Sequence, residues 1–403
     1  MKGIGMMKIN FAESIGAFRN HVPAAGKWAY LETASTGLIP DFVHDGVRRY
    51  EEARYRRGGN SVWQFEEDQV ETLEMIERSK EAIAQMIHGT KEEIAFGQSS
   101  TQLFTLVTEG IDYGQKDNVI TVDKGWIGNR YAWQKKEDEG LEVRYVTPRD
   151  GAIRVDDIIA YCDENTQAIT VNLVENTTGF LIDINRLGAF CQKHDILLFV
   201  DAVQALGVLQ VDVKKCHIDF LVGNDYKWMM NYCGTGYAYI SPKVQRRIRH
   251  WGAGWMSDTD RFCTEKLRLN LRQDAGRFEI GYPRADGIYG LGLVAKQYAR
   301  LGGEAIQQYT VGLADYFRQR VEETDGLCLT YRFNRENLCQ IVSVSVDESV
   351  AVDNEAFEKA RVFAHLQERA GRPGKREIRA GFHYYNNKED IDRFFAVIEE
   401  ARK

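Results

Sequence analysis

The sequence predicts an α/β protein with a mostly parallel, seven-stranded sheet between helices, followed by a smaller α+β domain. From about residue 93, short apolar runs alternate with helical patterns, which is typical of strand–helix–strand units. The apolar runs are continuous rather than alternating, as expected for parallel strands that are buried on both faces. After about residue 285 the order changes to long helical segments with fewer strands, which indicates a second unit.

Each predicted strand of the first unit is a short apolar run, and amphipathic segments such as residues 184–193 separate several of them. Ligands of open parallel sheets lie beyond the carboxyl ends of the strands. Asp201 ends one of these runs, so we expect it at the functional edge of the sheet. The expected strands are residues 93–96, 118–122, 141–146, 167–173, 196–201, 220–223 and 236–240.

The second unit begins with two helical segments, which are followed by strands and further helices. We expect the residues before about position 45, which precede the periodic region, to pack against this unit. The predicted domains are therefore a large one, residues 46–284, and a small one, residues 1–45 with 285–403. The expected elements are helices at 287–301, 304–323, 354–370 and 388–402, and strands at 328–333, 341–346 and 377–380.

Composition and charge exclude several classes of protein. The chain has 403 residues, 44% of them hydrophobic, and a formal net charge of −7, which argues against a sequence-independent nucleic-acid binder. No apolar run approaches the roughly 18 residues of a membrane span, and the start of the chain lacks the apolar centre of a signal peptide. The seven cysteines are scattered, without the spacing of zinc ligands, and are interpreted as reduced thiols. We therefore expect a cytoplasmic protein with no metal site, no nucleic acid and no membrane among its partners.

A phosphate site is indicated by the stretch FGQSSTQLFTLVTEGI, residues 96–111. A strand ends there, and Ser99, Ser100 and Thr101 begin an amphipathic helix, whose first backbone N–H groups have no partner within the helix. A helix N-terminus with hydroxyl side chains can bind phosphate. Taken alone, the pattern is also that of an ordinary Ser/Thr N-cap.

Two charged residues follow buried strands further along the chain. Asp201 can pair with the protonated ring nitrogen of a heteroaromatic cofactor, or can serve as the N-cap of a helix. Lys227, between Tyr226 and Trp228, can be half-buried with a lowered pKa and form a Schiff base, or can extend to solvent. Taken together, the phosphate site, the acid and the lysine are three requirements of pyridoxal 5'-phosphate (PLP).

These residues lie in a block that resembles a known family. VDAVQALGVLQVDVKKCHIDFLVGNDYKWMMNYCGTGYAYIS, residues 200–241, is similar in spacing and residue type to the signature of the class V aminotransferases, which are PLP-dependent enzymes of fold type I. YLETASTG, residues 30–37, is similar to the family's YLDNAAT, and the resemblance continues to the end of the chain. This superfamily contains cysteine desulfurases, isopenicillin-N epimerase-like proteins and kynureninase.

The resemblance implies a role for each matching residue. Lys227 would form the Schiff base with PLP and later move protons at the substrate α-carbon, and Asp201 would pair with the pyridine nitrogen. Gln204 would contact the phenolic oxygen of the ring. Contacts with the cofactor phosphate are implied for four residues, of which the last two stand where relatives usually carry Ser and His: Ser100, Thr101, Asn224 and Tyr226.

Three more residues complete the implied site. Asn176, in ENTTG, matches the family's Asn-x-Thr-Gly and would lie beside cofactor and substrate. Trp126 falls where an aromatic ring, often His, stacks on the pyridine face, although it can also be a core tryptophan. Arg379, in REIRAGFHYYNN, resembles the arginine that binds the substrate α-carboxylate through a bidentate fork. His383, nearby, is expected to cap a helix or face solvent rather than to line the pocket.

Two departures from the family pattern bear on function. Cysteine desulfurases need a nucleophilic cysteine shortly before the arginine segment, and this sequence has none from residue 340 onward, which disfavours persulfide formation. Cys328 and Cys339 are expected on strands or at their edges, and buried. Tyr282 stands where a threonine usually reaches the cofactor phosphate of the partner subunit, so the resemblance implies a homodimer with the active site at the subunit interface.

We expect a PLP-dependent enzyme that acts on the α-carbon amine of a small amino acid, most simply an aminotransferase. A PLP-dependent carbon–sulfur lyase or an amino-acid epimerase is the alternative, because these reactions share their first steps. A cofactor-free scaffold of the same fold is the non-enzyme alternative, but it would not need Lys227, Asp201, Gln204 and Asn176 together. A nicotinamide-dependent oxidoreductase is rejected, because GQSSTQ stands in place of GxGxxG after the first strand.

Overall fold

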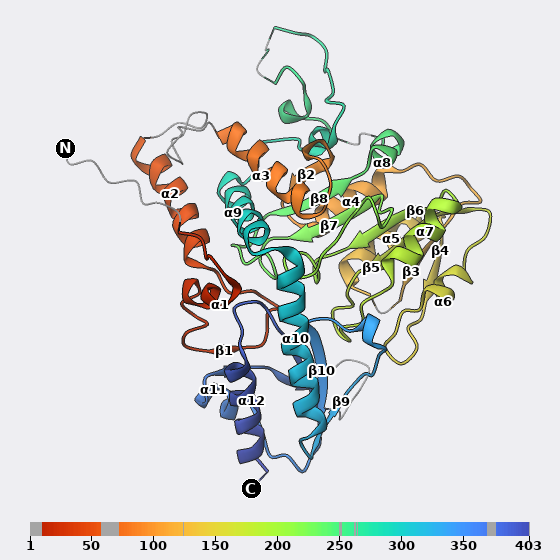
Figure 1. The fold of residues 1–403 in the computed structure, drawn as a ribbon. Coiled ribbons are helices and arrows are strands. Elements are labelled where there is room, and N and C mark those ends of the chain that lie inside the picture. The colour runs from red at the N-terminus through yellow and green to blue at the C-terminus, as the bar shows by residue number, and fades with distance from the viewer. Residues whose placement is uncertain are drawn as a thin grey trace, which may run out of the picture.

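The computed structural model describes residues 10–57, 72–123, 125–249, 252–261, 263, 265–368 and 376–402. It has a large part built around a seven-stranded sheet and a smaller part with a four-stranded sheet (Figure 1). Helices α9 and α10 follow one another from the first part into the second. The helices are α1 Ile15–Phe18, α2 Asp41–Arg57, α3 Thr72–Met86, α4 Ser100–Gly110, α5 Ile127–Asp138, α6 Val155–Ile159, α7 Ile184–Lys193, α8 Pro242–Arg247, α9 Ala285–Leu301, α10 Gly303–Glu322, α11 Asn354–Lys359 and α12 Lys388–Glu400.

The large sheet has the strand order β2-β8-β7-β6-β5-β3-β4. All of its pairs are parallel except the two that β8 makes with β2 and β7. The predicted α/β class with a mostly parallel sheet is therefore confirmed, with one antiparallel strand inside it. The strands of this sheet are β2 Ile94–Gly97, β3 Asn118–Val122, β4 Glu142–Val146, β5 Thr166–Asn172, β6 Leu197–Asp201, β7 Phe220–Asn224 and β8 Gly236–Ile240.

Strand β6 shows why the sequence runs of the large sheet are continuously apolar. Successive side chains point to opposite faces, and each face is covered by helices. Leu198 and Val200 belong to one core cluster, which includes residues of α3, α7 and α9. Leu197 and Phe199 belong to another, with residues of α4 and α5. Both sets are buried, so neither face of the strand tolerates a polar residue until Asp201, at the carboxyl end.

The smaller part packs an antiparallel sheet, in the order β12-β13-β10-β9, against α10, α11 and α12. The N-terminal segment joins it, because β1 pairs in parallel with β11 and Leu31 lies in the same core cluster. The boundaries of the two predicted domains stay a prediction. The remaining strands are β1 Ala29–Tyr30, β9 Leu327–Leu329, β10 Ile341–Val346, β11 Val362–Phe363, β12 Leu366–Glu368 and β13 Arg376–Gly381.

Two predicted elements of this part are wrong in extent. The helix expected at 354–370 ends at Lys359, because Arg361 takes a left-handed conformation, with φ of 54°, that stops the helix. The chain then forms the short strands β11 and β12. The strand expected at 328–333 covers only Leu327–Leu329, since its pairing with β10 stops there.

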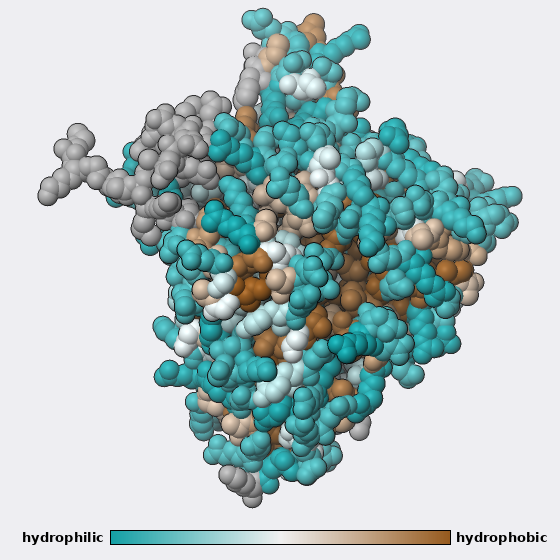
Figure 2. Space-filling model, viewed as in Figure 1, coloured by the Kyte–Doolittle hydropathy of each residue, from teal (hydrophilic) through white to brown (hydrophobic). Residues whose placement is uncertain are grey.

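The surface shown in Figure 2 is mostly hydrophilic, and apolar residues show mainly in a band across the middle of this face. Among the helices of the described residues, none combines the length and the apolar character that a bilayer crossing requires.

Candidate active site

Nine of the predicted site residues line one cavity at the carboxyl edge of the large sheet. The register of the parallel strands explains part of this convergence. Asn172, at the end of β5, lies opposite Asp201, at the end of β6, and Asp201 lies opposite Val222 of β7. The nine residues, whose individual roles stay predictions, are Ser100, Thr101, Trp126, Asn176, Asp201, Gln204, Asn224, Tyr226 and Lys227.

Lys227 follows β7 and has a buried amine. The residue is 9% exposed. Its Nζ lies 5.4 Å from the ring centroid of Trp126 and 5.9 Å from that of Tyr226. The pKa of Lys227 is lowered to about 8, mainly by burial; the charge of Asp201 opposes this shift and the charge of Arg379 adds to it. An amine of this kind is neutral much more often near pH 7 than an ordinary lysine, and a neutral amine is needed for attack on an aldehyde.

Asp201 is a buried acid with two fixed hydrogen bonds. Its Oδ2 accepts from Asn129 Nδ2 at 2.6 Å, and its Oδ1 accepts from the Val203 backbone at 2.9 Å. Burial raises the pKa of Asp201, and the two hydrogen bonds and Lys227 offset this only in part. A cationic group placed beside the carboxylate would stabilise its ionised form.

The phosphate region is built by the start of α4. Ser99 is the N-cap, and its Oγ accepts a hydrogen bond from the Gln102 backbone at 3.1 Å. Ser100 and Thr101 form the first turn and border the cavity. Strand β8 passes close behind this turn, since a Cβ at Gly236 would lie 2.5 Å from the Ser100 nitrogen. The positive end of an 11-residue helix therefore borders the cavity, where an anion is favoured.

Gln204 joins the cavity to a segment that the sequence reasoning did not place there. Its Nε2 donates to the Ala34 carbonyl at 3.0 Å, and its Oε1 accepts from Trp228 Nε1 at 2.7 Å. A second N–H remains on Nε2. Ala34 belongs to residues 30–37, which we call the N-terminal strap. The predicted contact of Gln204 with the cofactor ring stays a prediction.

The N-terminal strap lies directly against the lysine. The Gly37 backbone donates to the Tyr226 carbonyl at 2.8 Å. A Cβ at Gly37 would lie 1.9 Å from the Lys227 carbonyl oxygen, so only glycine fits there without a shift of the backbone. Gly37, the last residue of YLETASTG, is the sequence feature that could have indicated a close approach between two backbones. The local sequence does not reveal that the other backbone is that of Lys227.

Arg379, on β13, borders the cavity through Asn176. Its Nη1 donates to the Asn176 carbonyl at 2.8 Å, and its Nη2 donates to Ser35 Oγ at 2.6 Å. The carboxylate of Glu32 lies 3.7 Å from the same Nη2. The charge of Arg379 acts on Lys227, as described above, so the guanidinium lies near enough to the amine to influence it electrostatically. The predicted binding of the substrate carboxylate by Arg379 stays a prediction.

Tyr282 does not line the cavity of its own chain. It is 42% exposed, and its ring stacks on Trp255 with centroids 6.3 Å apart. The predicted reach of Tyr282 into the cofactor site of a partner subunit, and with it the homodimer, stays a prediction.

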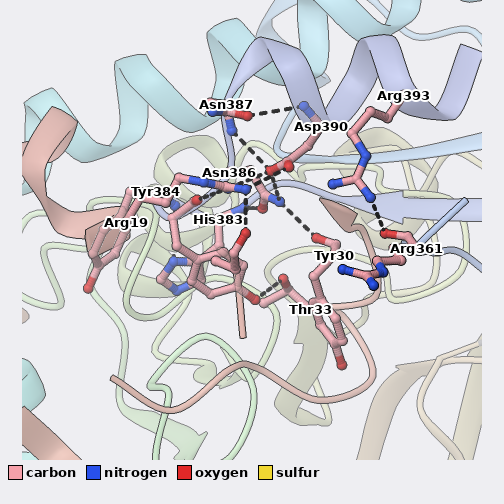
Figure 3. Close-up of polar contacts among 12 residues, drawn as sticks. Arg19, Tyr30, Thr33, Arg361, His383, Tyr384, Asn386, Asn387, Asp390 and Arg393 are labelled. Carbon is pink, nitrogen blue, oxygen red and sulfur yellow. Dashed lines mark hydrogen bonds and ion pairs between the residues drawn. The ribbon is translucent and has the colours of Figure 1, made fainter. Parts of the chain in front are cut away.

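Two expectations about other residues are wrong. His383 is fully buried, stacks on Tyr385 with centroids 4.6 Å apart, and contacts the Trp228 carbonyl through Nε2 at 3.0 Å. Burial lowers the pKa of His383 to about 3, so it is a neutral core residue and not a capping or surface residue. Figure 3 shows His383 in the same group of residues as Tyr384 and Asn386. Cys328 is exposed because β9 is an edge strand, whereas Cys339 is buried as expected.

The cavity fits an aromatic aldehyde that carries a phosphate and a basic ring nitrogen. The helix N-terminus suits the phosphate, the indole of Trp126 offers a flat apolar face, and the buried acid Asp201 would be stabilised by a protonated ring nitrogen. The buried amine of Lys227 has the chemistry of the nucleophile that this cofactor requires. These four features are the chemistry that PLP needs.

The comparison with protein families agrees with this fit. The family model described as aminotransferase class V matches residues 29–394. The chain belongs to the class V aminotransferase family. PLP is the cofactor of this family, so the predicted family and cofactor are both confirmed.

Class V relatives resemble the chain over nearly its whole length. A probable cysteine desulfurase of Methanothermobacter thermautotrophicus is 24% identical, over 95% of this chain and 96% of the relative. A cysteine desulfurase of Pectobacterium atrosepticum is 26% identical, over 93% of each.

Solved structures of the same fold include two informative neighbours. The apo cysteine desulfurase of Thermococcus onnurineus NA1 has a TM-score of 0.82 at 23% identity, over 98% of this chain and 99% of that one. The cystine C–S lyase C-DES, solved with its product cysteine persulfide, has a TM-score of 0.81 at 18% identity, over 94% of this chain and 98% of that one. These likenesses confirm the fold of this class V enzyme.

Proposed function

We propose that this class V enzyme removes the α-proton of a small amino acid. The observation that carries the proposal is that the amine of Lys227 and the carboxyl of Asp201 line one cavity, while the guanidinium of Arg379 donates to the carbonyl of Asn176, which lines the same cavity. Each of the three groups matches one need of an amino-acid reaction: a base, a partner for a ring nitrogen and a carboxylate anchor.

PLP, when bound, supplies an aldehyde and a cationic ring that draws electrons from the substrate α-carbon. Asp201 would hold the ring nitrogen in its protonated form through its negative charge. Arg379 binds the substrate carboxylate and so fixes which bond of the α-carbon faces Lys227. The Nζ of Lys227, whose neutral form is made more accessible because burial lowers its pKa, would accept the α-proton and return it at a later step. Trp126, which lines the same cavity, would offer its ring face to the cofactor ring.

Two reactions at this carbon are candidates. Transamination is the reaction that the resemblance predicts. Carbon–sulfur cleavage is favoured by a specific observation, which is that the relatives are named cysteine desulfurases and one structural neighbour is a cystine C–S lyase. Because the sequence has no cysteine from residue 340 onward, such a lyase would release its sulfur product into solution rather than store it on a thiol of that segment.

The test is a screen of amino acids against the holoenzyme, followed by product analysis. Wild type should be yellow, lose its visible band slowly on borohydride treatment, and change its spectrum with at least one small amino acid. One keto acid per active site, formed without an added acceptor, would indicate transamination. Pyruvate, ammonia and sulfide formed catalytically from cysteine would indicate the lyase.

A matched variant separates enzyme from scaffold. In Lys227→Ala, borohydride treatment should attach no cofactor covalently to the protein, because the Schiff base that it reduces cannot form. Turnover should also be abolished. A wild-type protein that stays colourless with PLP and responds to no amino acid would contradict the proposal and favour the scaffold.

A further inference from the structure

We propose that Glu32 and Ser35 position Arg379 and thereby set the affinity of the site for the substrate carboxylate. The proposal rests on the proposed function, in which Arg379 binds that carboxylate. It assigns two positioning residues in the N-terminal strap, about 340 residues away along the chain from the arginine that they hold.

Ser35 bridges the arginine and the glutamate. Arg379 Nη2 and Ser35 Oγ are 2.6 Å apart, and Ser35 Oγ and Glu32 Oε2 are 2.9 Å apart. A guanidinium has no acceptor, so Ser35 must accept from Arg379, and its single hydroxyl proton is then donated to Glu32. The direct distance of 3.7 Å from Nη2 to Glu32 is too long for a good hydrogen bond. The Ser35 hydroxyl therefore links the Glu32 carboxylate to the Arg379 guanidinium through two consecutive hydrogen bonds.

Two held nitrogens fix the plane of the guanidinium. Ser35 Oγ accepts a hydrogen bond from Nη2, and the Asn176 carbonyl accepts one from Nη1 at 2.8 Å. Arginine otherwise has much rotamer freedom, which a ligand must remove when it binds. Bidentate recognition of a carboxylate also requires the correct plane. An arginine held in advance therefore binds the substrate carboxylate more tightly than a free one.

The strap can act as a fixed support because it is tied down on both sides of Glu32. The Tyr30 hydroxyl donates to the Thr36 carbonyl at 2.8 Å and closes the strap on itself. Thr33 Oγ1 and the Tyr385 hydroxyl are 2.6 Å apart. Asn386 Nδ2 donates to the Tyr30 carbonyl at 2.8 Å (Figure 3). The strap is thus anchored to the segment that leads into α12.

The backbone also sets the register between support and arginine. Glu32 forms a parallel bridge with Gly381, and the Gly381 backbone donates to the Leu31 carbonyl at 2.7 Å. A Cβ at Gly381 would point toward the strap, 3.3 Å from the Ala34 nitrogen, and Arg379, two residues earlier on the same strand, projects to that same face of β13. Ser35 stands where the family pattern quoted above has alanine, so the hydroxyl bridge is a feature of this chain.

The test compares a carboxylate ligand with the same ligand lacking the carboxylate. The probes are the L-amino acid that gives the largest spectral change in the screen and the corresponding amine without its α-carboxylate. Dissociation constants are measured on the holoenzyme from the change in visible absorbance, beside KM and kcat. Ser35→Ala and Glu32→Gln should each raise the dissociation constant of the amino acid by about tenfold. The dissociation constant of the amine should stay unchanged. KM should rise more than kcat falls.

Conservative variants and a neighbour serve as controls. Ser35→Thr and Glu32→Asp keep the hydroxyl and the carboxylate, so both should restore most of the affinity. Thr36→Ala, an exposed position on the same strap, should behave as wild type. Thermal melting of each holoenzyme checks that the variants are folded. If Glu32→Gln is not folded, the comparison of Ser35→Ala with Ser35→Thr tests the positioning role alone.

Failure of the inference differs from failure of the function. If Arg379→Ala loses amino-acid affinity while Ser35→Ala and Glu32→Gln keep it, the positioning role is overturned and the function stands. If the two variants raise the dissociation constants of amino acid and amine equally, Glu32 and Ser35 support the site as a whole and not the recognition of the carboxylate. The proposal is then also overturned. If wild type responds to no amino acid, the proposed function fails, and the inference fails with it.

Discussion

Lys227 shows at the scale of one residue how burial prepares a side chain for chemistry. The amine is buried close to two aromatic rings, and its charged form is therefore disfavoured. The same burial makes the folded protein hold its proton less tightly than the unfolded chain does. Between about pH 8 and the ordinary lysine value, the unfolded state binds more protons, so the free energy of unfolding contributed by this residue rises with pH.

The first prediction concerns the rate at which the cofactor-free protein takes up PLP. Only the neutral amine attacks the aldehyde, so the rate should rise about tenfold per pH unit and level off near the pKa of Lys227, which is about 8. The measurement is the growth of visible absorbance after mixing, from pH 6 to pH 10. In Asp201→Asn the levelling should move to lower pH, because the charge of Asp201 raises the pKa of Lys227. A rate that still climbs steeply at pH 10 would show an ordinary, exposed lysine.

The second prediction concerns Asn129, a residue that the sequence did not single out. Asn129→Ala removes a hydrogen bond at 2.6 Å from a buried carboxylate, which should raise the pKa of Asp201 further and weaken its ionised form. We expect the dissociation constant of PLP to rise about tenfold, measured by dialysis against limiting cofactor. Asn118→Ala is the matched control, since Asn118 donates to Asp163 at 2.8 Å at the opposite end of the sheet. Equal PLP affinity in the two variants would contradict the prediction.

At the scale of elements, the N-terminal strap is the part of the site that depends most on close packing. Gly37→Ala places a methyl group against the Lys227 carbonyl, where the ideal distance is only 1.9 Å. The strap or the lysine loop must move, so we expect a loss of about 1–3 kcal/mol in the free energy of unfolding together with weaker PLP binding. Both are measurable by urea titration with and without cofactor.

The control for this prediction is Gly312→Ala, in α10. Gly312 is exposed, and a Cβ added there would meet open space, so alanine should stabilise the helix by about 0.5–1 kcal/mol. If Gly37→Ala were also stabilising, the close approach of the strap to the lysine would not exist in solution.

The elements also show what the sequence could and could not predict. The strands of the large sheet were predictable because each is a continuous apolar run, and Asn118–Val122 and Gly236–Ile240 have the expected bounds. The direction of β8 was not predicted, although its short connection from β7 contains no helix and favours an antiparallel neighbour. The helix beyond Lys359 was overpredicted because the left-handed turn at Arg361 has no glycine to announce it.

The site, too, has residues that the sequence could predict and residues that it could not. Lys227, Asp201 and Arg379 stand in stretches whose order and residue types are informative on their own. Asn129 and Ser35 act on partners 72 and 344 residues away, so no local pattern reveals them. Short polar side chains are common at turns and helix starts, and only the folded chain shows which of them meets a functional group.

At the scale of the whole molecule, the beginning and the end of the chain are joined by a buried charge. Arg19 makes two hydrogen bonds with Asp390, at 2.7 and 2.9 Å, and also donates to the Tyr385 carbonyl at 2.7 Å (Figure 3). The side chain of Asp390 is only 1% exposed and also belongs to the capping box of α12, with Asn387. This junction holds the segment to which the N-terminal strap is anchored.

The fourth prediction follows from this junction. Asp390→Asn removes the charge of a side chain that is 1% exposed and leaves Arg19, whose side chain is 23% exposed, without its ionic partner, so we expect a loss of about 2 kcal/mol in the free energy of unfolding. Asp392→Asn is the matched control, because Asp392 pairs with Arg320 while its side chain is 49% exposed, and its loss should stay below about 1 kcal/mol. Urea unfolding monitored by circular dichroism measures both. Equal losses would show that the Arg19 pair is screened by water.

The strap has a consequence for how the protein is made. Residues 30–37 precede the large sheet in the sequence, whereas Tyr385 and Asp390, to which their surroundings are tied, follow it. The strands of the large sheet can pair before the segment around Tyr385 has been synthesised. The strap gains its anchors only when that later segment is present, so the order of synthesis separates formation of the sheet from fixing of the strap beside Lys227.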